Sequence, residues 1–223
     1  MAHAGAGRHE PKQFLELAGQ PILVMTVRAF LQVSAVQRIF VAVRKNEIER
    51  VESVLRKHGM LDIVSVVEGG DTRQESVRNA VKMLPAEDDD IVLVHDAVRP
   101  LIDVATIQRT IESVERHDAA IVAVPAIDTI KQVERTADGA IITSTIPRER
   151  IVLAQTPQGF RFRILSRGME AAEADGFLGT DEASLVERLG IEVAVVPGSP
   201  RNLKITQPDD LALAEFYLHQ NQP

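Results

Sequence analysis

The sequence predicts an α/β protein whose sheet is mostly parallel and is covered by helices on both faces. Short apolar runs rich in valine and isoleucine alternate along the chain with amphipathic stretches of helical period. Strands of this kind are typical of parallel sheets, which are buried on both sides because the connecting helices pack against them. At 223 residues and 45% hydrophobic, the chain is long enough for one sizeable core. We therefore expect a single domain over residues 1–223.

The elements follow one another in a regular order. In the helix expected over 47–58, Ile48, Val51, Val54 and Leu55 share one face. The elements expected up to residue 124 are strand 37–43, helix 47–58, strand 62–67, helix 73–84, strand 91–95, helix 104–116 and strand 119–124. Those expected after residue 160 are helices 161–174 and 182–189, strands 191–196 and 203–206, and a final helix 209–219.

The alternation breaks between residues 127 and 156. Two runs of alternating polarity, 129–133 and 140–145, flank Thr136-Ala137-Asp138-Gly139, and Asp-Gly is a strong turn signal for a hairpin. A two-stranded ribbon has little core of its own and must lie on something. We expect an arm at about 127–150 that protrudes from the sheet onto another subunit. A hairpin packed on its own domain fits the pattern equally well.

Composition narrows the possible partners. No apolar run approaches the roughly 18 residues of a membrane span, and the N-terminus lacks the pattern of a signal peptide. The absence of cysteine excludes disulfides and thiolate metal sites and fits a cytoplasmic location. A net charge of −7 and 4% aromatic residues disfavour nucleic acid and anionic membranes as partners. Any anionic ligand must then be held by a few local cations.

A carboxylate comes directly after the most strand-like segment of the chain. Residues 91–94 are Ile-Val-Leu-Val, and Asp96 and Arg99 come next. Ligands of open α/β sheets bind just outside the carboxyl ends of the strands. Asp96 there offers an oxygen ligand for Mg²⁺, and Arg99 offers a cation for a phosphate. The alternative is an ordinary turn at the end of the strand, in which Asp96 caps the next segment.

A short glycine-rich stretch lies near the N-terminus. Gly5 and Gly7 precede Arg8, and Lys12 lies a few residues further on. Glycines let backbone N–H groups approach phosphates, and nearby cations neutralise their charge. The stretch matches neither a Walker loop nor the three spaced glycines of a dinucleotide-binding fold. A flexible terminus of the same composition is the alternative.

A second glycine pair opens the helix expected at residue 73. Gly69 and Gly70 allow the backbone to pack against a flat ligand. Asp71 either caps the helix or accepts from an exocyclic amine, and Ser76 in the first turns points toward the strand ends. A capped helix after a Gly-Gly turn explains the pattern without a ligand.

Two segments near the C-terminus also carry candidate residues. Lys204 is flanked by apolar residues in an expected strand, so it either projects into solvent or reaches into a cleft for an anion. Thr180 and Asp181 begin a helix, and one of them is expected to cap it. Helix N-termini also attract phosphate, although capping requires no ligand.

Taken together, seven strings resemble the 2-C-methyl-D-erythritol 4-phosphate cytidylyltransferases of the non-mevalonate isoprenoid pathway. They occur in the same order as in the family and span nearly the whole chain. The matching strings are Pro11-Lys12-Gln13-Phe14, Gly69-Gly70-Asp71 with Arg73 and Ser76-Val77, His95-Asp96-Ala97-Val98-Arg99-Pro100, Asp128-Thr129-Ile130-Lys131, Gln155-Thr156-Pro157-Gln158, Thr180-Asp181-Glu182-Ala183-Ser184 and Asn202-Leu203-Lys204-Ile205-Thr206.

The resemblance implies a Rossmann-like three-layer α/β/α nucleotidyltransferase fold and transfer of a cytidylyl group from CTP to the phosphate of methylerythritol phosphate. Mg²⁺ is the implied cofactor, held largely by the CTP phosphates with Asp96 nearby. Lys12, Lys204 and Arg8 would stabilise charge on the transferred phosphate, in keeping with the general demands of phosphoryl-type transfer. The implied nucleotide-binding residues are Gly5, Gly7, Gly70, Asp71, Ser76, Asp96 and Ala97, and the implied acceptor-binding residues are Arg99, Thr129, Arg148, Thr156 and Thr180.

The resemblance also implies a homodimer, because the arm of such enzymes crosses to a partner subunit and closes its acceptor site. Thr129 and Arg148 lie on this arm. One departure concerns the N-terminus: the family begins with a central strand that has no counterpart before Ala4, and the loop before Lys12 is a few residues short. We therefore expect the chain as written to bind CTP weakly. Two alternatives stay open, a ribitol-5-phosphate cytidylyltransferase and a catalytically impaired nucleotide-binding module.

Overall fold

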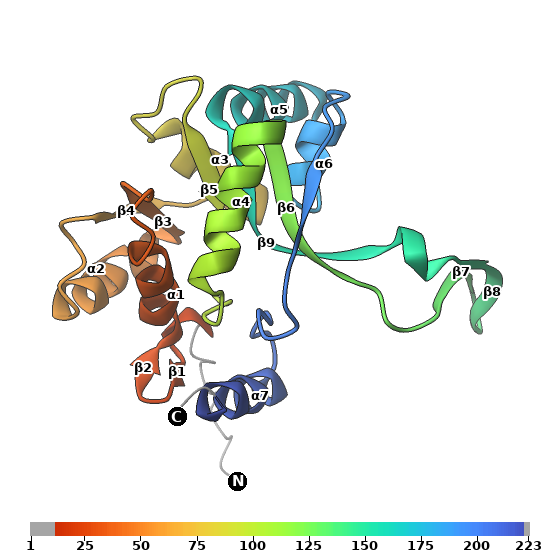
Figure 1. Cartoon of the computed structure of the whole chain (residues 1–223), viewed down its shortest axis with the longest axis horizontal. Coiled ribbons are helices and arrows are strands. Elements are labelled where there is room, and N and C mark those ends of the chain that lie inside the picture. Colours follow the sequence, from red (N-terminus) through yellow and green to blue (C-terminus); the bar gives the residue numbers. More distant parts are fainter. Residues whose placement is uncertain (1–11, 221–223) are drawn as a thin grey trace, which may run out of the picture.

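Helices cover both faces of the strands in a computed structural model that describes residues 12–220 and, of Lys12, only the backbone (Figure 1). Helix α4 (Val104–His117) packs on one face and helix α5 (Phe162–Asp175) on the other. Consecutive residues of one strand face these two helices in turn, because side chains along a strand point to opposite faces of the sheet. A Cβ added to Gly159 would meet Val114 of α4, whereas Phe160 packs with Leu165 of α5. The expected three-layer α/β/α fold class is confirmed.

The larger sheet has four strands in the order β10-β6-β9-β5. They are β5 (Ile91–Val94), β6 (Ala119–Pro125), β9 (Val152–Arg161) and β10 (Ala194–Pro197). Strand β10 is parallel to β6, and β9 runs antiparallel to both β6 and β5. Strands β5, β6 and β10 therefore point the same way, and β9 is the exception.

A separate two-stranded sheet consists of β3 (Ile39–Val43) and β4 (Val64–Glu68), which are parallel. Helices α1 (Ile22–Leu31) and α2 (Ile48–Lys57) pack against it through a common apolar cluster. Within residues 12–220, no strand pairs with both β3 and β5.

Helix α3 (Arg73–Lys82) comes after β4, and α6 (Glu182–Glu187) lies beside α5. The last helix, α7 (Pro208–His219), packs near a small hairpin of β1 (Glu16–Leu17) and β2 (Gln20–Pro21). Single turns of 3₁₀ helix occupy Lys12–Phe14, Lys45–Glu47 and Arg148–Arg150. No helix in the described part of the chain is both long and apolar enough to cross a bilayer.

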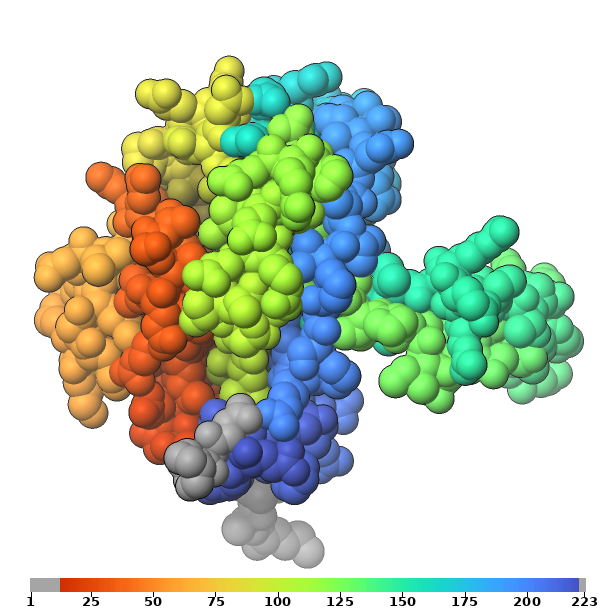
Figure 2. Space-filling model, viewed as in Figure 1, coloured from red at the N-terminus to blue at the C-terminus, as the bar shows by residue number. Residues whose placement is uncertain are grey.

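The predicted arm protrudes from the body of the molecule (Figures 1 and 2). It consists of β7 (Ile130–Thr136) and β8 (Gly139–Ile146), which pair antiparallel, with Thr136 opposite Gly139 across the turn. Ile141 and Ile142 are 62% and 59% exposed. The arm thus stands away from its own domain, contrary to the alternative of a hairpin packed on it.

Three details differ from the expectations. Residues 203–206 form no strand; Ile205 instead donates a single backbone hydrogen bond to Val98 at 2.9 Å, which aligns this segment with the loop after β5. Helix α1 and strand β9 were not predicted. Both are rich in buried residues, and neither shows the helical or alternating polarity on which the predictions relied.

Candidate active site

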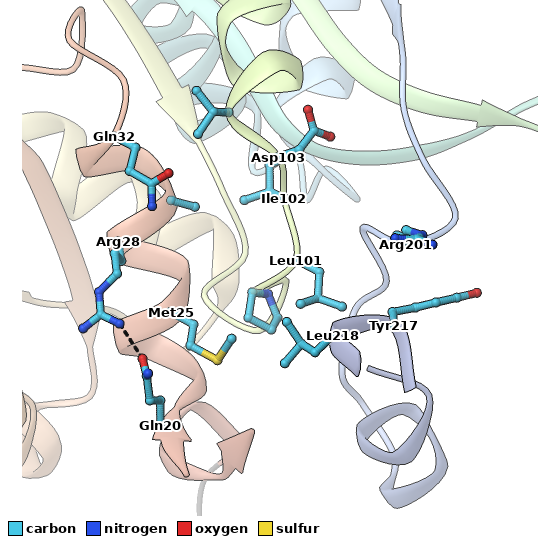
Figure 3. Close-up of a pocket in the computed structure, with 13 residues that line it drawn as sticks. Gln20, Met25, Arg28, Gln32, Leu101, Ile102, Asp103, Arg201, Tyr217 and Leu218 are labelled. Atoms are coloured by element: carbon cyan, nitrogen blue, oxygen red, sulfur yellow. Dashed lines mark hydrogen bonds between the residues drawn. The ribbon is translucent and has the colours of Figure 1, made fainter. Parts of the chain in front are cut away.

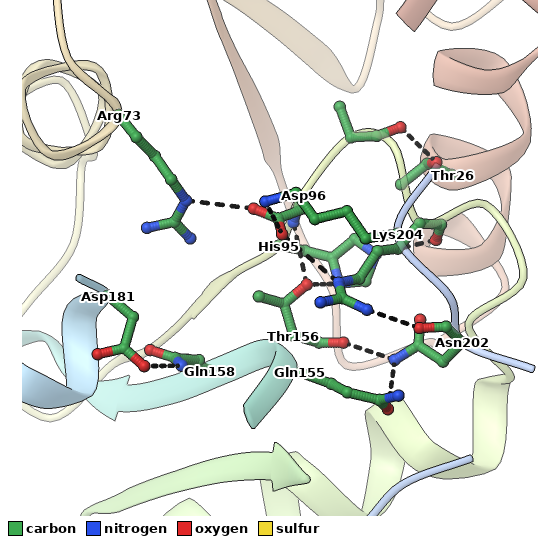
Figure 4. A network of polar contacts seen from close by, with 12 residues as sticks. Thr26, Arg73, His95, Asp96, Gln155, Thr156, Gln158, Asp181, Asn202 and Lys204 are labelled. Carbon is green, nitrogen blue, oxygen red and sulfur yellow. Dashed lines mark hydrogen bonds and ion pairs between the residues drawn. The ribbon is translucent and has the colours of Figure 1, made fainter. Parts of the chain in front are cut away.

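Asp96, just beyond the carboxyl end of β5, gathers three cationic side chains (Figure 4). Lys204 Nζ lies 3.1 Å from its Oδ2, Arg99 Nε lies 3.4 Å from the same oxygen, and Arg73 Nε lies 3.2 Å from Oδ1. The Asp96 side chain is 12% exposed, whereas that of Lys204 is 43% exposed. The structure thus brings together Asp96 and Arg99, which the sequence singled out in one motif, and Lys204, which it singled out in another.

These cations keep Asp96 ionised. Burial alone would raise the pKa of Asp96, but the charges of Arg73 and Lys204 outweigh this effect and hold the pKa below its ordinary value. Burial lowers the pKa of Arg99, which is still a cation at neutral pH. Even with Glu182, which also pairs with Arg73, two carboxylates face three cations, and the excess of positive charge suits an anionic ligand.

Hydrogen bonds between side chains and backbone groups fix the loop that carries Asp96. Thr26 of α1 donates its hydroxyl to the carbonyl of Ala97 at 2.8 Å. The Asp96 amide donates to Thr156 Oγ1 at 3.1 Å, and Arg99 Nη1 donates to the carbonyl of Asn202 at 2.7 Å. Three distant segments therefore meet at this loop, and Ala97, an expected nucleotide contact, faces α1 with its carbonyl.

His95 connects the two ends of the same loop. Its Nε2 lies 3.1 Å from the carbonyl of Arg99 and its Nδ1 lies 3.0 Å from Thr156 Oγ1. Burial lowers the pKa of His95 to about 4, so the ring is neutral at physiological pH. Because a carbonyl only accepts, Nε2 carries the ring proton, and Nδ1 accepts from the Thr156 hydroxyl. Thr156, an expected residue of the acceptor-substrate site, is 5% exposed, and its hydroxyl is hydrogen-bonded to His95 and to the Asp96 amide.

A second part of the site is a pocket of about 460 Å³ beside the start of α3. It contains the predicted residues Gly70 and Asp71, and it also contains Arg44 and Lys45, cations after β3 that the sequence analysis did not single out. Their only local signal is a pair of basic residues directly after a buried strand. Glu68 and Glu75 also line the pocket, which therefore offers backbone, carboxylates and cations in one hollow.

The glycines of this pocket have a packing role. A Cβ on Gly70 would lie 2.3 Å from Glu75 Cβ, and the Gly70 amide donates to Ser76 Oγ at 3.0 Å. Ser76 thus holds the loop through its hydroxyl. Thr72 caps α3 and forms a capping box with Glu75, so Asp71 does not cap the helix. Asp71 is exposed at the pocket.

The segment around Thr180 lies on the other side of Arg73. Asp181 caps α6 by accepting from the Ser184 amide at 3.0 Å, while Thr180 is exposed. Glu182 is 1% exposed, and both of its oxygens accept from Arg73 Nη1, at 2.7 and 2.9 Å. Burial raises the pKa of Glu182, an effect that Arg73 partly offsets. Neither Glu182 nor Arg73 was among the predicted site residues, although both occur in the family-like motifs of the sequence.

The remaining predicted residues are not gathered around Asp96. Thr129 and Arg148 lie at the base of the arm, away from the β5 loop of the same chain (Figure 1), and Arg148 Nη1 donates to the carbonyl of Ile127 at 2.7 Å. Gly5, Gly7 and Arg8 lie outside the described residues, as does the side chain of Lys12. The expected meeting of Lys12 and Lys204 therefore stays a prediction.

A different hollow, of about 530 Å³, lies between α1, the segment after Arg99 and α7 (Figure 3). Apolar side chains such as Met25, Leu101 and Leu218 line it, with Arg28 at the edge. None of the predicted site residues lines it. The predicted residues Gly70 and Asp71 line the smaller pocket, and Asp96, Arg99 and Lys204 form the cluster described above.

Comparison with known proteins gives one consistent result. The sequence model of the 2-C-methyl-D-erythritol 4-phosphate cytidylyltransferase family matches residues 2–220. A relative of that name from Acidobacterium capsulatum is 64% identical over 220 residues, which cover 99% of this chain and 92% of the relative. One from Geotalea uraniireducens is 49% identical, covering 93% of this chain and 88% of the relative. The crystal structure of the Francisella tularensis enzyme aligns with a TM-score of 0.79 at 36% identity, covering 93% of each chain.

Proposed function

The chain belongs to the 2-C-methyl-D-erythritol 4-phosphate cytidylyltransferase family and transfers a cytidylyl group from CTP to 2-C-methyl-D-erythritol 4-phosphate, and we propose that the Asp96 cluster is where the transfer takes place. The observation that supports this location is the convergence of Lys204, Arg99 and Arg73 on Asp96 at the carboxyl end of β5. The cluster offers positive charge where a phosphate must be held.

In the proposed reaction, a phosphate oxygen of the acceptor attacks the α-phosphorus of CTP. A new P–O bond forms, the bond between the α-phosphorus and the bridging oxygen breaks, and pyrophosphate leaves with that oxygen. The attacking oxygen is already an anion, so the site needs no strong general base. The exposed Lys204 amine neutralises charge that develops on the α-phosphate, and Arg99 holds the acceptor phosphate.

We propose that the cytidine part of CTP binds in the Gly70 pocket. Its volume of about 460 Å³ lies in the range of small-ligand sites. Asp71 is exposed there and does not cap a helix, so its carboxylate can accept from the exocyclic amine of cytosine. Arg44 and Lys45 supply positive charge at the same hollow. We assign base recognition to this pocket.

Mg²⁺ is the proposed cofactor. Among residues 12–220, no three acidic or histidine side chains are grouped so as to hold a metal ion on their own. Mg²⁺ commonly binds through one carboxylate together with substrate phosphates and water, and Asp96 offers one carboxylate beside the proposed phosphate site. Asp96 is the carboxylate that would hold it, and the ion would supply charge neutralisation on the CTP phosphates.

We further propose that the enzyme is a homodimer built through the arm. The arm extends away from its own domain and exposes the cross-strand pair Val133 and Ile142, an apolar surface that a second subunit would cover. Thr129 and Arg148 at its base would then complete the acceptor site of the partner subunit. The cysteine-free chain is proposed to act in the cytoplasm.

The test measures pyrophosphate release with Mg²⁺, CTP and either acceptor, 2-C-methyl-D-erythritol 4-phosphate or ribitol 5-phosphate. We expect turnover with the first acceptor. Turnover with ribitol 5-phosphate alone would contradict the assigned acceptor. If neither acceptor reacts while CTP still raises the Tm, the chain is an impaired nucleotide-binding module.

A further inference from the structure

The buried carboxylate of Glu182 has a partner but no role in the reaction described so far. It lies at the first residue of α6 and is 1% exposed. Both of its oxygens accept from the same nitrogen of Arg73, at 2.7 and 2.9 Å. Burial of a carboxylate is costly without a charged partner, and Arg73 supplies one.

Arg73 is shared between two carboxylates. Its Nη1 binds Glu182, while its Nε lies 3.2 Å from Asp96 Oδ1. The other oxygen of Asp96, Oδ2, is the one that Lys204 Nζ contacts at 3.1 Å. A chain of contacts therefore runs from Glu182 through Arg73 and Asp96 to the proposed catalytic amine.

Glu182 and Arg73, the first two residues in this series of contacts, come from different parts of the fold. Arg73 begins α3, directly after the Gly70 loop, whereas Glu182 begins α6, next to Thr180. A second buried side chain fixes the start of α6: Gln158 of β9 donates to Asp181 Oδ2 at 2.8 Å and accepts from the Ala183 amide at 3.0 Å. Glu182 is thus a rigid anchor, and Arg73 is the longer side chain whose position depends on it.

From this geometry we propose that Glu182 is a positioning residue for cytidylyl transfer. It holds the Arg73 guanidinium against Asp96, and Asp96 in turn sets where the Lys204 amine lies. Glu182 does not touch the reactants. This inference rests on the proposed function, because Asp96 and Lys204, whose positions depend on Glu182, belong to the proposed transfer site.

A double-mutant cycle in the full chain, assayed at saturating CTP and acceptor, tests the proposal. Glu182→Gln keeps the size of the side chain but removes its charge, and Arg73→Gln removes the guanidinium. We expect each variant to lower kcat by about 10- to 100-fold, the scale of a small misplacement at a reacting centre, with both KM values within about twofold. We expect the double variant to have the kcat of Arg73→Gln, because Glu182 acts only through Arg73.

A matched control comes from a similar link nearby. Glu173 of α5 binds Arg78 of α3 at 2.6 Å, so Glu173→Gln also removes a carboxylate that ties α3 to a later helix. We expect its kcat to stay within about twofold of the original. An equal loss in this control would mean that α3 needs any such link, which would overturn a specific role for Glu182.

Other outcomes also decide the matter. If Arg73→Gln alone does not fold, because it leaves the buried Glu182 carboxylate unpaired, Glu182→Gln is compared with the double variant, which leaves no unpaired charge at this position. An unchanged kcat in Glu182→Gln or in Arg73→Gln, or a kcat of the double variant below that of Arg73→Gln, overturns the proposal. Absence of pyrophosphate release from the unsubstituted chain would instead refute the proposed function.

Discussion

Replacing Lys204 with methionine is the most direct test of the transition-state role. Methionine keeps an unbranched apolar side chain of similar length but removes the amine that lies 3.1 Å from Asp96. Removal of one donor to a transition-state oxyanion costs about 10²- to 10³-fold in rate, or about 3–4 kcal/mol. We therefore expect kcat to fall by on the order of 100-fold or more, measured as pyrophosphate release at saturating substrates.

We expect Lys204→Met to change the free energy of unfolding far less than it changes kcat. The Lys204 side chain is 43% exposed, and Asp96 keeps Arg73 and Arg99 as partners after the substitution. An ion pair of such exposure contributes at most about 1 kcal/mol, which corresponds to a Tm shift of about 2–4 °C in a protein of this size. Lys82→Met, which removes an amine 62% exposed and 3.6 Å from Glu173, is the matched control. A normal kcat with a raised KM would show that Lys204 only binds substrate.

Three other contacts give further predictions. Gly70→Ala places a Cβ 2.3 Å from that of Glu75, so the loop must shift; we expect the KM for CTP to rise about tenfold or more, and an unchanged KM would separate the loop from nucleotide binding. Arg148→Ala should raise the KM for the acceptor, whereas Arg135→Ala near the arm tip should not; equal kinetics in both would mean that the arm does not close the site. The pKa of His95 is about 4 in the folded protein and 6.5 in the unfolded chain. Its contribution to stability is therefore complete above pH 6.5 and is lost as the pH falls toward 4; at about 1.4 kcal/mol for each pKa unit it amounts to about 3–4 kcal/mol. His95→Gln should flatten urea-denaturation stability over that range, and an unaltered pH dependence would contradict this assignment.

Local sequence signals predicted the parts of the site that lie at strand ends. Asp96 was found because a carboxylate comes after a buried strand, and strand ends of α/β sheets carry ligands. Lys204 was found as a cation between apolar residues, although its segment is not a strand. In both cases the information lies within a few residues of the site.

Such local signals could not predict contacts between residues that are far apart in the sequence. Glu182 and Arg73 are 109 positions apart, so no local pattern shows that they bind. Strand β9 was missed for a similar reason: Gln155 and Gln158 look like loop residues, yet they are 7% and 1% exposed. Their amides are satisfied by Asn202 and Asp181, which lie far along the chain.

The division between β3–β4 and the larger sheet has a mechanical consequence. Within residues 12–220 no hydrogen-bonded ladder joins the two halves, and they meet through apolar side chains such as Phe30, Ile39 and Leu93. Arg73 also crosses this seam to reach Asp96. Within the described residues, the placement of the Gly70 pocket relative to Asp96 therefore depends on side-chain contacts and not on strand pairing.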